Sequence, residues 1–142
     1  MRFKIYNAQS EGTKMKKKIL LVDDIKEFRA LLKIILSGNY EVITAEDGEE
    51  AISIIESGVE PDVIVTDLVM PRMDGYQLIS RVKSSTPYSK IPIIVLSDVD
   101  KAEKKERLKD SGVMSYMNKP FNTTELREGL GRSLTTALAS CN

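Results

Sequence analysis

The sequence predicts an α/β domain built on a parallel sheet, with helices covering both faces. Short apolar runs rich in β-branched residues alternate five times with longer stretches of helical periodicity, a pattern typical of buried parallel strands. The 142 residues are enough for one domain to bury a core without disulfides or a structural metal. Polar residues follow four of the apolar runs, where ligand sites form in such sheets. We expect strands at residues 18–22, 40–44, 62–66, 91–96 and 113–117.

Four helices are predicted from apolar residues that recur at three- and four-residue steps. The first carries Ile25, Phe28, Leu31, Leu32, Ile35 and Leu36, and Gly38 follows it. The second begins with a capping box at Asp47 and Glu50, buries Ala51, Ile52 and Ile55, and ends before Gly58. The third begins at Asp74 and buries Leu78, Ile79 and Val82. The last begins at Asn122 with Glu125 and buries Leu126, Leu130 and Leu134.

The remaining helix, near residues 100–110, differs in having only a thin apolar stripe. Its apolar residues are Val99, Ala102 and Leu108. Charged residues fill the other positions: Lys101, Glu103, Lys104, Lys105, Glu106, Arg107 and Lys109. We therefore expect a loosely anchored helix with a solvated face of mixed charge.

Composition excludes several classes of function. No histidine is present, so histidine-dependent triads, general bases and metal sites are excluded. Basic and acidic residues number 21 each, so no net charge recruits nucleic acid or an anionic membrane. No apolar run approaches the roughly 20 residues that span a bilayer, and the first 18 residues lack the apolar stretch of a signal peptide. With Cys141 as the only cysteine, we expect a cytoplasmic protein in a reducing compartment.

The ends of the chain differ from its centre. Residues 1–15 show no strong periodicity and are interpreted as an N-terminal extension, tag or linker. Residues 16–138 are expected to form the domain, with a C-terminal tail at 139–142. The residues after the last helix are too few for an output domain, so the protein either acts alone through contacts or is excised from a longer chain.

Polar residues at the ends of the apolar runs define a candidate site. Asp23 and Asp24 end the first run, Asp67 the third and Ser97 the fourth, and Lys119 lies just beyond the fifth. Because the carboxyl ends of parallel strands share one edge, these side chains are expected to converge. Each also has a local explanation, as a helix cap, a loop or turn residue, or a surface lysine.

Three converging carboxylates repel one another, by about 4 kcal/mol for each pair 4 Å apart at an effective dielectric constant near 20. A divalent ion and Lys119 would compensate this charge, and an all-oxygen site suits Mg²⁺. Phosphoryl chemistry then becomes the candidate reaction, with Asp67 as nucleophile and Ser97 and Lys119 contacting phosphoryl oxygens.

The motifs that carry these residues resemble those of two-component response regulator receiver domains, of the chemotaxis-regulator type. They are Ile19-Leu20-Leu21-Val22-Asp23-Asp24, Val63-Ile64-Val65-Thr66-Asp67, Met70-Pro71-Arg72-Met73-Asp74-Gly75, Ile93-Ile94-Val95-Leu96-Ser97 and Asn118-Lys119-Pro120-Phe121. The resemblance covers residues 16–138 and implies a flavodoxin-like (βα)5 doubly wound sheet with strand order 2-1-3-4-5. It also implies a signalling switch that catalyses its own phosphotransfer and dephosphorylation.

The resemblance implies a role for each matching residue. Asp67 is the phosphoacceptor, Asp23, Asp24 and Asp67 hold Mg²⁺ together with the backbone carbonyl of Val69, and Lys119 neutralises the phosphoryl group. A cis bond is expected between Lys119 and Pro120.

The resemblance also implies a switch. Ser97 is its hydroxyl, and Tyr116 is its aromatic residue, for which the alternative is an edge-strand aromatic. Phosphorylation would draw Ser97 inward, turn Tyr116 and remodel the face formed by the fourth helix, fifth strand and fifth helix.

The expected partners follow from the same resemblance. Because the chain has no histidine, the phosphodonor is the phosphohistidine of a separate sensor histidine kinase or phosphotransfer protein. Output passes to a downstream protein target or an attached output domain, or through a phosphorylation-dependent dimer on the remodelled face, without direct contact to nucleic acid or membrane.

Two other functions compete with this interpretation. An unphosphorylated docking module stays an alternative, whereas a phosphatase of the haloacid dehalogenase type lacks the acid that it needs at Val69. The chain departs from the family in carrying Asp98 after Ser97, where family members usually have a small residue. Val69 and Val99 cannot orient an attacking water, which leaves the phosphorylated lifetime open.

Overall fold

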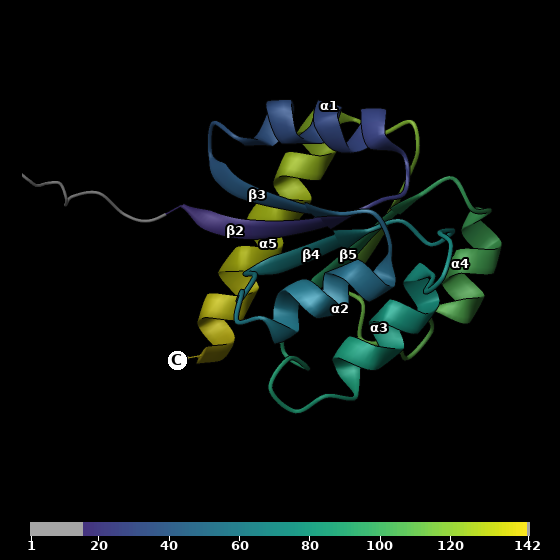
Figure 1. Ribbon diagram of the computed structural model, residues 1–142. Helices are drawn as coiled ribbons and strands as arrows, with labels where there is room; N and C mark the ends of the chain where they lie inside the picture. Colours follow the sequence, from purple (N-terminus) through teal and green to yellow (C-terminus); the bar gives the residue numbers. More distant parts are fainter. Residues whose placement is uncertain (1–15, 142) are drawn as a thin grey trace, which may run out of the picture.

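A parallel five-stranded sheet lies between two layers of helices in the computed structural model, which describes residues 16–141 (Figure 1). The strands are β2 (Lys17–Val22), β3 (Tyr40–Ala45), β4 (Val63–Thr66), β5 (Ile93–Ser97) and β6 (Ser115–Asn118). The helices are α1 (Lys26–Leu36), α2 (Gly48–Glu56), α3 (Gly75–Lys83), α4 (Lys101–Arg107) and α5 (Thr123–Cys141). The extension expected at residues 1–15 and the terminal Asn142 lie outside the described residues.

The strand order is β3-β2-β4-β5-β6, so the predicted order 2-1-3-4-5 is confirmed. Neighbouring strands pair in parallel throughout, for example with Val22 opposite Thr66 and Ser97 opposite Asn118. The carboxyl ends of all five strands therefore meet at one edge of the sheet, as a doubly wound α/β topology requires.

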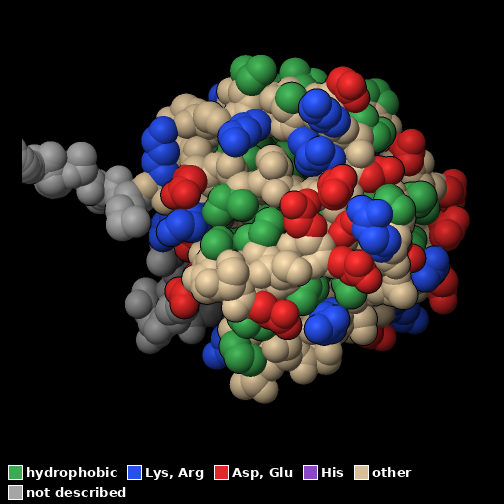
Figure 2. Space-filling view, in the orientation of Figure 1, with side chains coloured by type: hydrophobic (Ala, Val, Ile, Leu, Met, Phe, Trp, Pro, Cys, Tyr) green, Lys and Arg blue, Asp and Glu red, His purple; other side chains and the backbone are tan. Residues whose placement is uncertain are grey.

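Two apolar clusters form the core, one on each face of the sheet. Alternate strand residues point to opposite faces, so Leu20 packs with α2 and α3 while Leu21 packs with α1 and α5. All residues of β4 and β5 are buried, which explains their continuous apolar sequences. On the exterior, Figure 2 shows acidic, basic and hydrophobic side chains together on one face.

Strand boundaries differ from the predicted ones by a few residues. The predicted third strand begins one residue later, at Val63. Asp62 lies before it, where its amide donates to the Lys18 carbonyl (2.9 Å) and its side chain accepts from the Lys18 amide (2.7 Å). β5 begins after Pro92, since Ile91 belongs to a turn in which its amide donates to the Tyr88 carbonyl (3.0 Å). These polar contacts lie at the entrance of each strand and leave its exit, where the candidate site lies, unchanged.

Two of the predicted helix caps are confirmed, and one is formed differently. Asp74 and Gln77 form a capping box at α3, and Asn122 accepts from the Glu125 amide before α5. Asp47 caps α2 by accepting from the Glu50 amide (2.9 Å), but the Glu50 carboxylate accepts from the amide of Glu46 rather than from that of Asp47.

Helix α1 has no side-chain cap, so Asp24 does not serve in that role. Of its predicted apolar residues, Leu32 and Leu36 are buried, whereas Ile25 and Leu31 are 49% and 48% exposed. Helix α1 therefore carries more apolar residues than it buries in the core.

Helix α4 corrects one expectation. Six of its seven residues are exposed, as the charged sequence predicts, but Lys104 is fully buried. Its ammonium contacts the ends of β5 and β6, and Leu108 is buried just after the helix. The expectation of a wholly solvated charged face is therefore wrong at Lys104, because the charge there points into the domain.

Candidate functional site

Three carboxylates converge where β2 and β4 end. Asp23 and Asp24 follow β2, Asp67 follows the neighbouring β4, and one oxygen of each lies within 4.8 Å of those of the others. Asp23 and Asp67 are 1% and 6% exposed, while Asp24 is exposed to solvent. The predicted convergence of these carboxylates is thus present in the structure.

Backbone hydrogen bonds orient the two buried carboxylates. The Asp67 amide donates to the Val22 carbonyl (2.9 Å), which continues the β2–β4 pairing by one residue. Asp23 Oδ1 accepts from the amide of Ile25 (2.8 Å), and Asp67 Oδ1 accepts from that of Leu68 (2.6 Å). In each carboxylate, Oδ1 is therefore held by the residue's own loop, and Oδ2 is left for a partner from another element.

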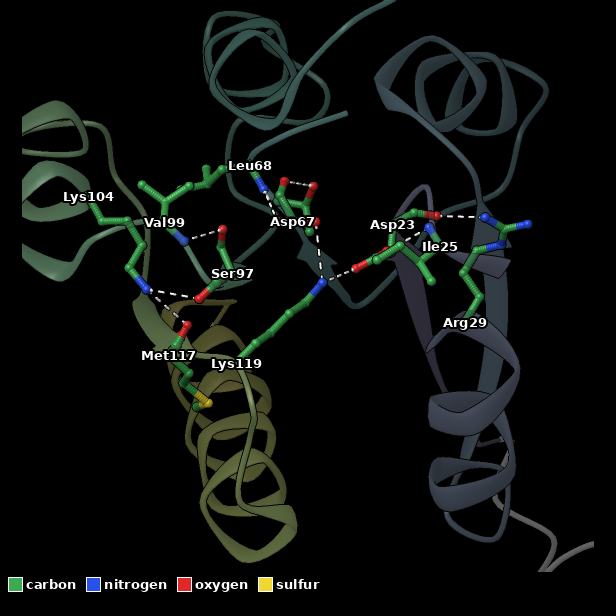
Figure 3. Close-up of polar contacts among 11 residues, drawn as sticks. Asp23, Ile25, Arg29, Asp67, Leu68, Ser97, Val99, Lys104, Met117 and Lys119 are labelled. Atoms are coloured by element: carbon green, nitrogen blue, oxygen red, sulfur yellow. Dashed lines mark hydrogen bonds and ion pairs between the residues drawn. The ribbon is translucent and has the colours of Figure 1, made fainter. Parts of the chain in front are cut away.

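Lys119 supplies the cation between these two oxygens (Figure 3). Its ammonium donates to Asp23 Oδ2 (2.7 Å) and to Asp67 Oδ2 (3.3 Å). The same Nζ lies 4.2 Å from the ring centroid of Phe28 on α1, a cation–π contact that closes the site on the side of that helix. The Lys119–Pro120 bond is cis, as expected.

Burial and the neighbouring charges shift the pKa values of Asp23 and Lys119 in opposite directions. Burial raises the pKa of Asp23 above its ordinary value even though the hydrogen bond from Lys119 opposes this change. Burial alone would lower the pKa of Lys119, but its hydrogen bond to Asp23 and the charge of Asp67 outweigh burial and raise that pKa. Lys119 therefore stays charged at neutral pH and partly compensates the acidic cluster.

Ser97 and Tyr116 lie on β5 and β6, the two strands that continue the sheet beyond β4. Ser97 is fully buried at the end of β5, and its hydroxyl oxygen accepts from the amide of Val99 (3.2 Å). Tyr116 on β6 pairs in register with Val95 and packs, partly buried, against the core on the α2–α3–α4 face. It also lines a surface pocket together with Ala102 and Leu108.

Val69 lies in the loop after Asp67, and its side chain is 63% exposed. Asp98, which follows the buried Ser97, is exposed as well. The approach to Asp67 is therefore open to solvent on this side of the sheet edge.

Three residues that contact the site or its strand ends were not among the predicted site residues. Phe28 was expected only as an apolar residue of the first helix, yet its ring contacts Lys119. Arg29 donates through Nη1 to the Asp23 carbonyl (2.7 Å), and Lys104 donates to the Ser97 carbonyl (3.2 Å). Periodicity gives no signal for such contacts, because each joins residues from different elements.

The acidic cluster has the chemistry of a site for a hard cation. Its three carboxylates offer only oxygen, and the exposed Asp24 gives a hydrated ion access to them. The residues present therefore fit Mg²⁺, which favours carboxylate oxygens and retains several waters.

Comparison with protein families identifies the class to which this fold and site belong. A family model described as the response regulator receiver domain matches residues 19–130. The chain belongs to the response regulator receiver domain family, the signal-receiving domain of two-component systems.

Curated relatives include both single-domain regulators and large kinases. Chemotaxis protein CheY1 of Helicobacter pylori is 38% identical over 116 residues, which are 80% of this chain and 93% of that protein. Hybrid signal transduction histidine kinase D of Dictyostelium discoideum is 38% identical over 123 residues, 85% of this chain but 8% of the kinase. Sensor histidine kinase TmoS of Ectopseudomonas mendocina is 33% identical, and the match covers 12% of its length. The chain thus spans about a tenth of the length of these kinases.

Solved structures show the same fold. The chemotaxis response regulator CheY4 of Vibrio cholerae superimposes with a TM-score of 0.77 at 35% identity, over 84% of this chain and 100% of that chain. The signal receiver domain of a histidine kinase from Syntrophus aciditrophicus gives a TM-score of 0.78 at 30% identity, over 84% and 91% of the two chains. The flavodoxin-like fold expected from the sequence is therefore confirmed.

One further feature concerns membranes. Among the described helices, none is both long enough and apolar enough to cross a bilayer.

Proposed function

We propose that this receiver domain takes a phosphoryl group onto Asp67 from a phosphohistidine and thereby switches a protein-interaction surface. The observation that carries the proposal is the position of the Asp67 carboxylate, which lies in the acidic cluster and within 3.3 Å of the Lys119 ammonium. The phosphohistidine belongs to a sensor histidine kinase or a phosphotransfer protein and lies outside these 142 residues, which contain no histidine.

In the transfer, an Asp67 carboxylate oxygen forms a bond to phosphorus as the phosphorus–nitrogen bond of the donor breaks. The donor imidazole keeps the electron pair of that bond and takes up a proton. Asp23, Asp24, Asp67 and the backbone carbonyl of Val69 would hold Mg²⁺, which when bound neutralises charge on the phosphoryl oxygens. Lys119 turns from its two carboxylates to a phosphoryl oxygen, a move that its long side chain permits.

The switch begins at Ser97. Its hydroxyl accepts from the Val99 amide in the unmodified structure, and it would turn to donate to a phosphoryl oxygen. Tyr116, already partly buried against the core, would turn toward the space left by Ser97. The face formed by α4, β6 and α5 would change and serve a downstream protein, an attached output domain or a phosphorylation-dependent dimer.

The remaining assignments complete this proposal. Residues 16–138 belong to the receiver, and residues 1–15 are an extension, tag or linker. The separate tail expected at 139–142 is corrected, because α5 continues to Cys141. The exchange takes place in the cytoplasm, which is consistent with a single cysteine in the sequence. The domain also catalyses its own dephosphorylation, without contact to nucleic acid or membrane.

Incubation with acetyl phosphate and Mg²⁺, followed by intact mass measurement and peptide mapping, tests the proposal. We expect one phosphoryl group on Asp67, lost in Asp67→Asn and in the presence of a chelator. Asp62→Asn is the matched control, since Asp62 lies at the opposite end of β4 and should leave labelling unchanged. Labelling that persists in Asp67→Asn would refute Asp67 as the phosphoacceptor, and no labelling of the unmodified protein would favour the unphosphorylated docking module.

The switch is tested separately with Ser97→Ala. Asp67 should still be labelled, because the nucleophile, the acidic cluster and Lys119 remain. Beryllofluoride, a mimic of the phosphoryl group, should then alter hydrogen exchange in α4 of the unmodified protein but not of Ser97→Ala. Equal changes in the two proteins would remove Ser97 from the switch.

A further inference from the structure

Lys104 places a buried ammonium against the strand ends that carry Ser97 and Lys119 (Figure 3). The residue is fully buried although it lies on α4, whose other residues are all exposed. Its Nζ donates to the Ser97 carbonyl (3.2 Å), the Met117 carbonyl (3.2 Å) and the Asn118 side-chain oxygen (2.6 Å). An ammonium has three N–H groups, so its donors are fully used.

Packing alone does not explain a charge at this position. Burial lowers the pKa of Lys104, as expected when a cation leaves water. An apolar side chain of similar volume would fill the same space without the cost of desolvating a charge. A buried charge that needs particular acceptors can instead specify one arrangement of the helix. The three acceptors thus suggest that the ammonium fixes where α4 lies relative to the sheet.

The Ser97 carbonyl joins α4 to the phosphoryl-contacting segments. It accepts from the Lys104 ammonium and also from the backbone amide of Lys119 (3.0 Å). A shift of the Ser97 carbonyl therefore changes two hydrogen bonds, one from Lys104 on α4 and one from Lys119, the counterion of the acidic cluster. Arg107 on the same helix stacks 3.5 Å over the Tyr76 ring on α3, so its contact joins α4 to a helix and not to the switch residues.

We propose that Lys104 is a positioning residue that couples α4 to the switch: its ammonium holds the helix to Ser97 and Asn118 and transmits the displacement of Ser97 to α4. The inference rests on the proposed function, since phosphorylation of Asp67 supplies that displacement. Lys104 does not contact Asp67, so it acts through Ser97 and not on the phosphoryl group.

The test compares Lys104→Met, which keeps the length of the side chain and removes its donors, with Lys105→Met at the exposed neighbouring position. Asp67 labelling by acetyl phosphate should be retained in both variants. Hydrogen exchange of α4 without beryllofluoride should become about tenfold faster in Lys104→Met, the effect of losing a charge-assisted hydrogen bond. Beryllofluoride should no longer change that exchange, whereas Lys105→Met should respond like the unmodified protein.

A spectroscopic readout separates coupling from a merely structural role. The ¹⁵N resonance of the Lys104 ammonium, assigned by its absence in Lys104→Met, should shift when beryllofluoride is added to the unmodified protein. If Lys104→Met does not fold, Asn118→Ala, which removes the shortest of the three bonds, should reduce the response of α4 instead.

The outcomes distinguish the inference from the function on which it rests. Absence of Asp67 labelling in the unmodified protein would refute both. Normal labelling with an unshifted ammonium resonance, or with a full α4 response in Lys104→Met, would overturn the inference alone. Loss of labelling in Lys104→Met would also overturn it, because Lys104 would then belong to the phosphotransfer site itself.

Discussion

Asp23 and Lys119 are 96 residues apart in the sequence, and their side chains form a hydrogen bond of 2.7 Å. The contact exists because both residues follow strands whose carboxyl ends lie at the same sheet edge. In the unmodified protein Lys119 is thus a counterion of the acidic cluster.

Removal of this counterion should destabilise the protein when no metal ion is present. In Lys119→Met, Asp23 and Asp67 lose a charged partner while they remain buried. We expect a loss on the order of 3 kcal/mol in the free energy of unfolding, as for other broken buried ion pairs. Urea unfolding with a chelator measures it, with the exposed Lys105→Met as control. Added Mg²⁺ should stabilise Lys119→Met more than the unmodified protein; equal unfolding midpoints in the chelator would contradict the prediction.

Asp24 should contribute to metal binding more than to the stability of the metal-free protein. Its carboxylate is exposed, and an oxygen lies within 4.8 Å of those of Asp23 and Asp67. Asp24→Ala should leave the melting temperature in chelator nearly unchanged and reduce its rise with Mg²⁺, since a tenfold weaker affinity removes about 1.4 kcal/mol of stabilisation.

Calorimetry suits the Asp24 measurement because the chain has no tryptophan. Glu27→Ala, at an exposed acid on the following helix, is the control and should respond fully to Mg²⁺. A full response in Asp24→Ala would show that the ion binds without this carboxylate.

Asp47 should contribute stability that is lost in acid. Burial raises the pKa of this carboxyl, but hydrogen bonds from the Glu50 amide and Arg72 outweigh burial and hold the pKa below its ordinary value. A carboxyl with a lowered folded-state pKa stabilises the fold above its unfolded-state pKa, and this contribution disappears as pH falls through the folded-state pKa.

Asp47→Ala should therefore lower the free energy of unfolding by about 1 kcal/mol at neutral pH, the usual cost of a lost helix cap. The difference from the unmodified protein should shrink as the pH falls below about 3.9, the ordinary pKa of an aspartate. Urea unfolding across this range is the measurement, and the exposed Glu60→Gln serves as control. A difference that is independent of pH would mean that Asp47 acts through packing rather than charge.

Gly75 should tolerate no side chain, because the start of α3 lies directly against the Asp67 loop. A Cβ there would be 2.7 Å from Leu68 Cα and closer still to the Asp67 carbonyl oxygen. Gly75→Ala should cost about 1–3 kcal/mol, as overpacking against backbone usually does.

Gly131 provides the opposite case for the same substitution. It lies within α5, and a Cβ there would have no atom within 4 Å. Gly131→Ala should stabilise the protein by about 0.5–1 kcal/mol, since alanine is the better helix former. Thermal unfolding of both variants is the measurement. No destabilisation of Gly75→Ala would show that the close approach there does not limit stability, and a destabilised Gly131→Ala would contradict the prediction for α5.

The sequence by itself determined the parallel α/β class, the helix caps at Asp74 and Asn122, and which polar residues follow the strands. These features depend on local patterns, because the periodicity of apolar residues and the chemistry of a cap involve only neighbours in the chain. The motifs around Asp23, Asp67, Ser97 and Lys119 added the family to this local information.

Only the tertiary structure decided which way the charges point. In the sequence, Lys104 and Lys105 are adjacent lysines in one charged run, yet Lys104 is buried with three acceptors and Lys105 is exposed. Phe28 likewise became a contact of Lys119 only when α1 met the segment after β6, where its ring also packs edge-on against Phe121. Burial and pairing of a charge depend on groups from other elements of the fold, and no local pattern records those groups.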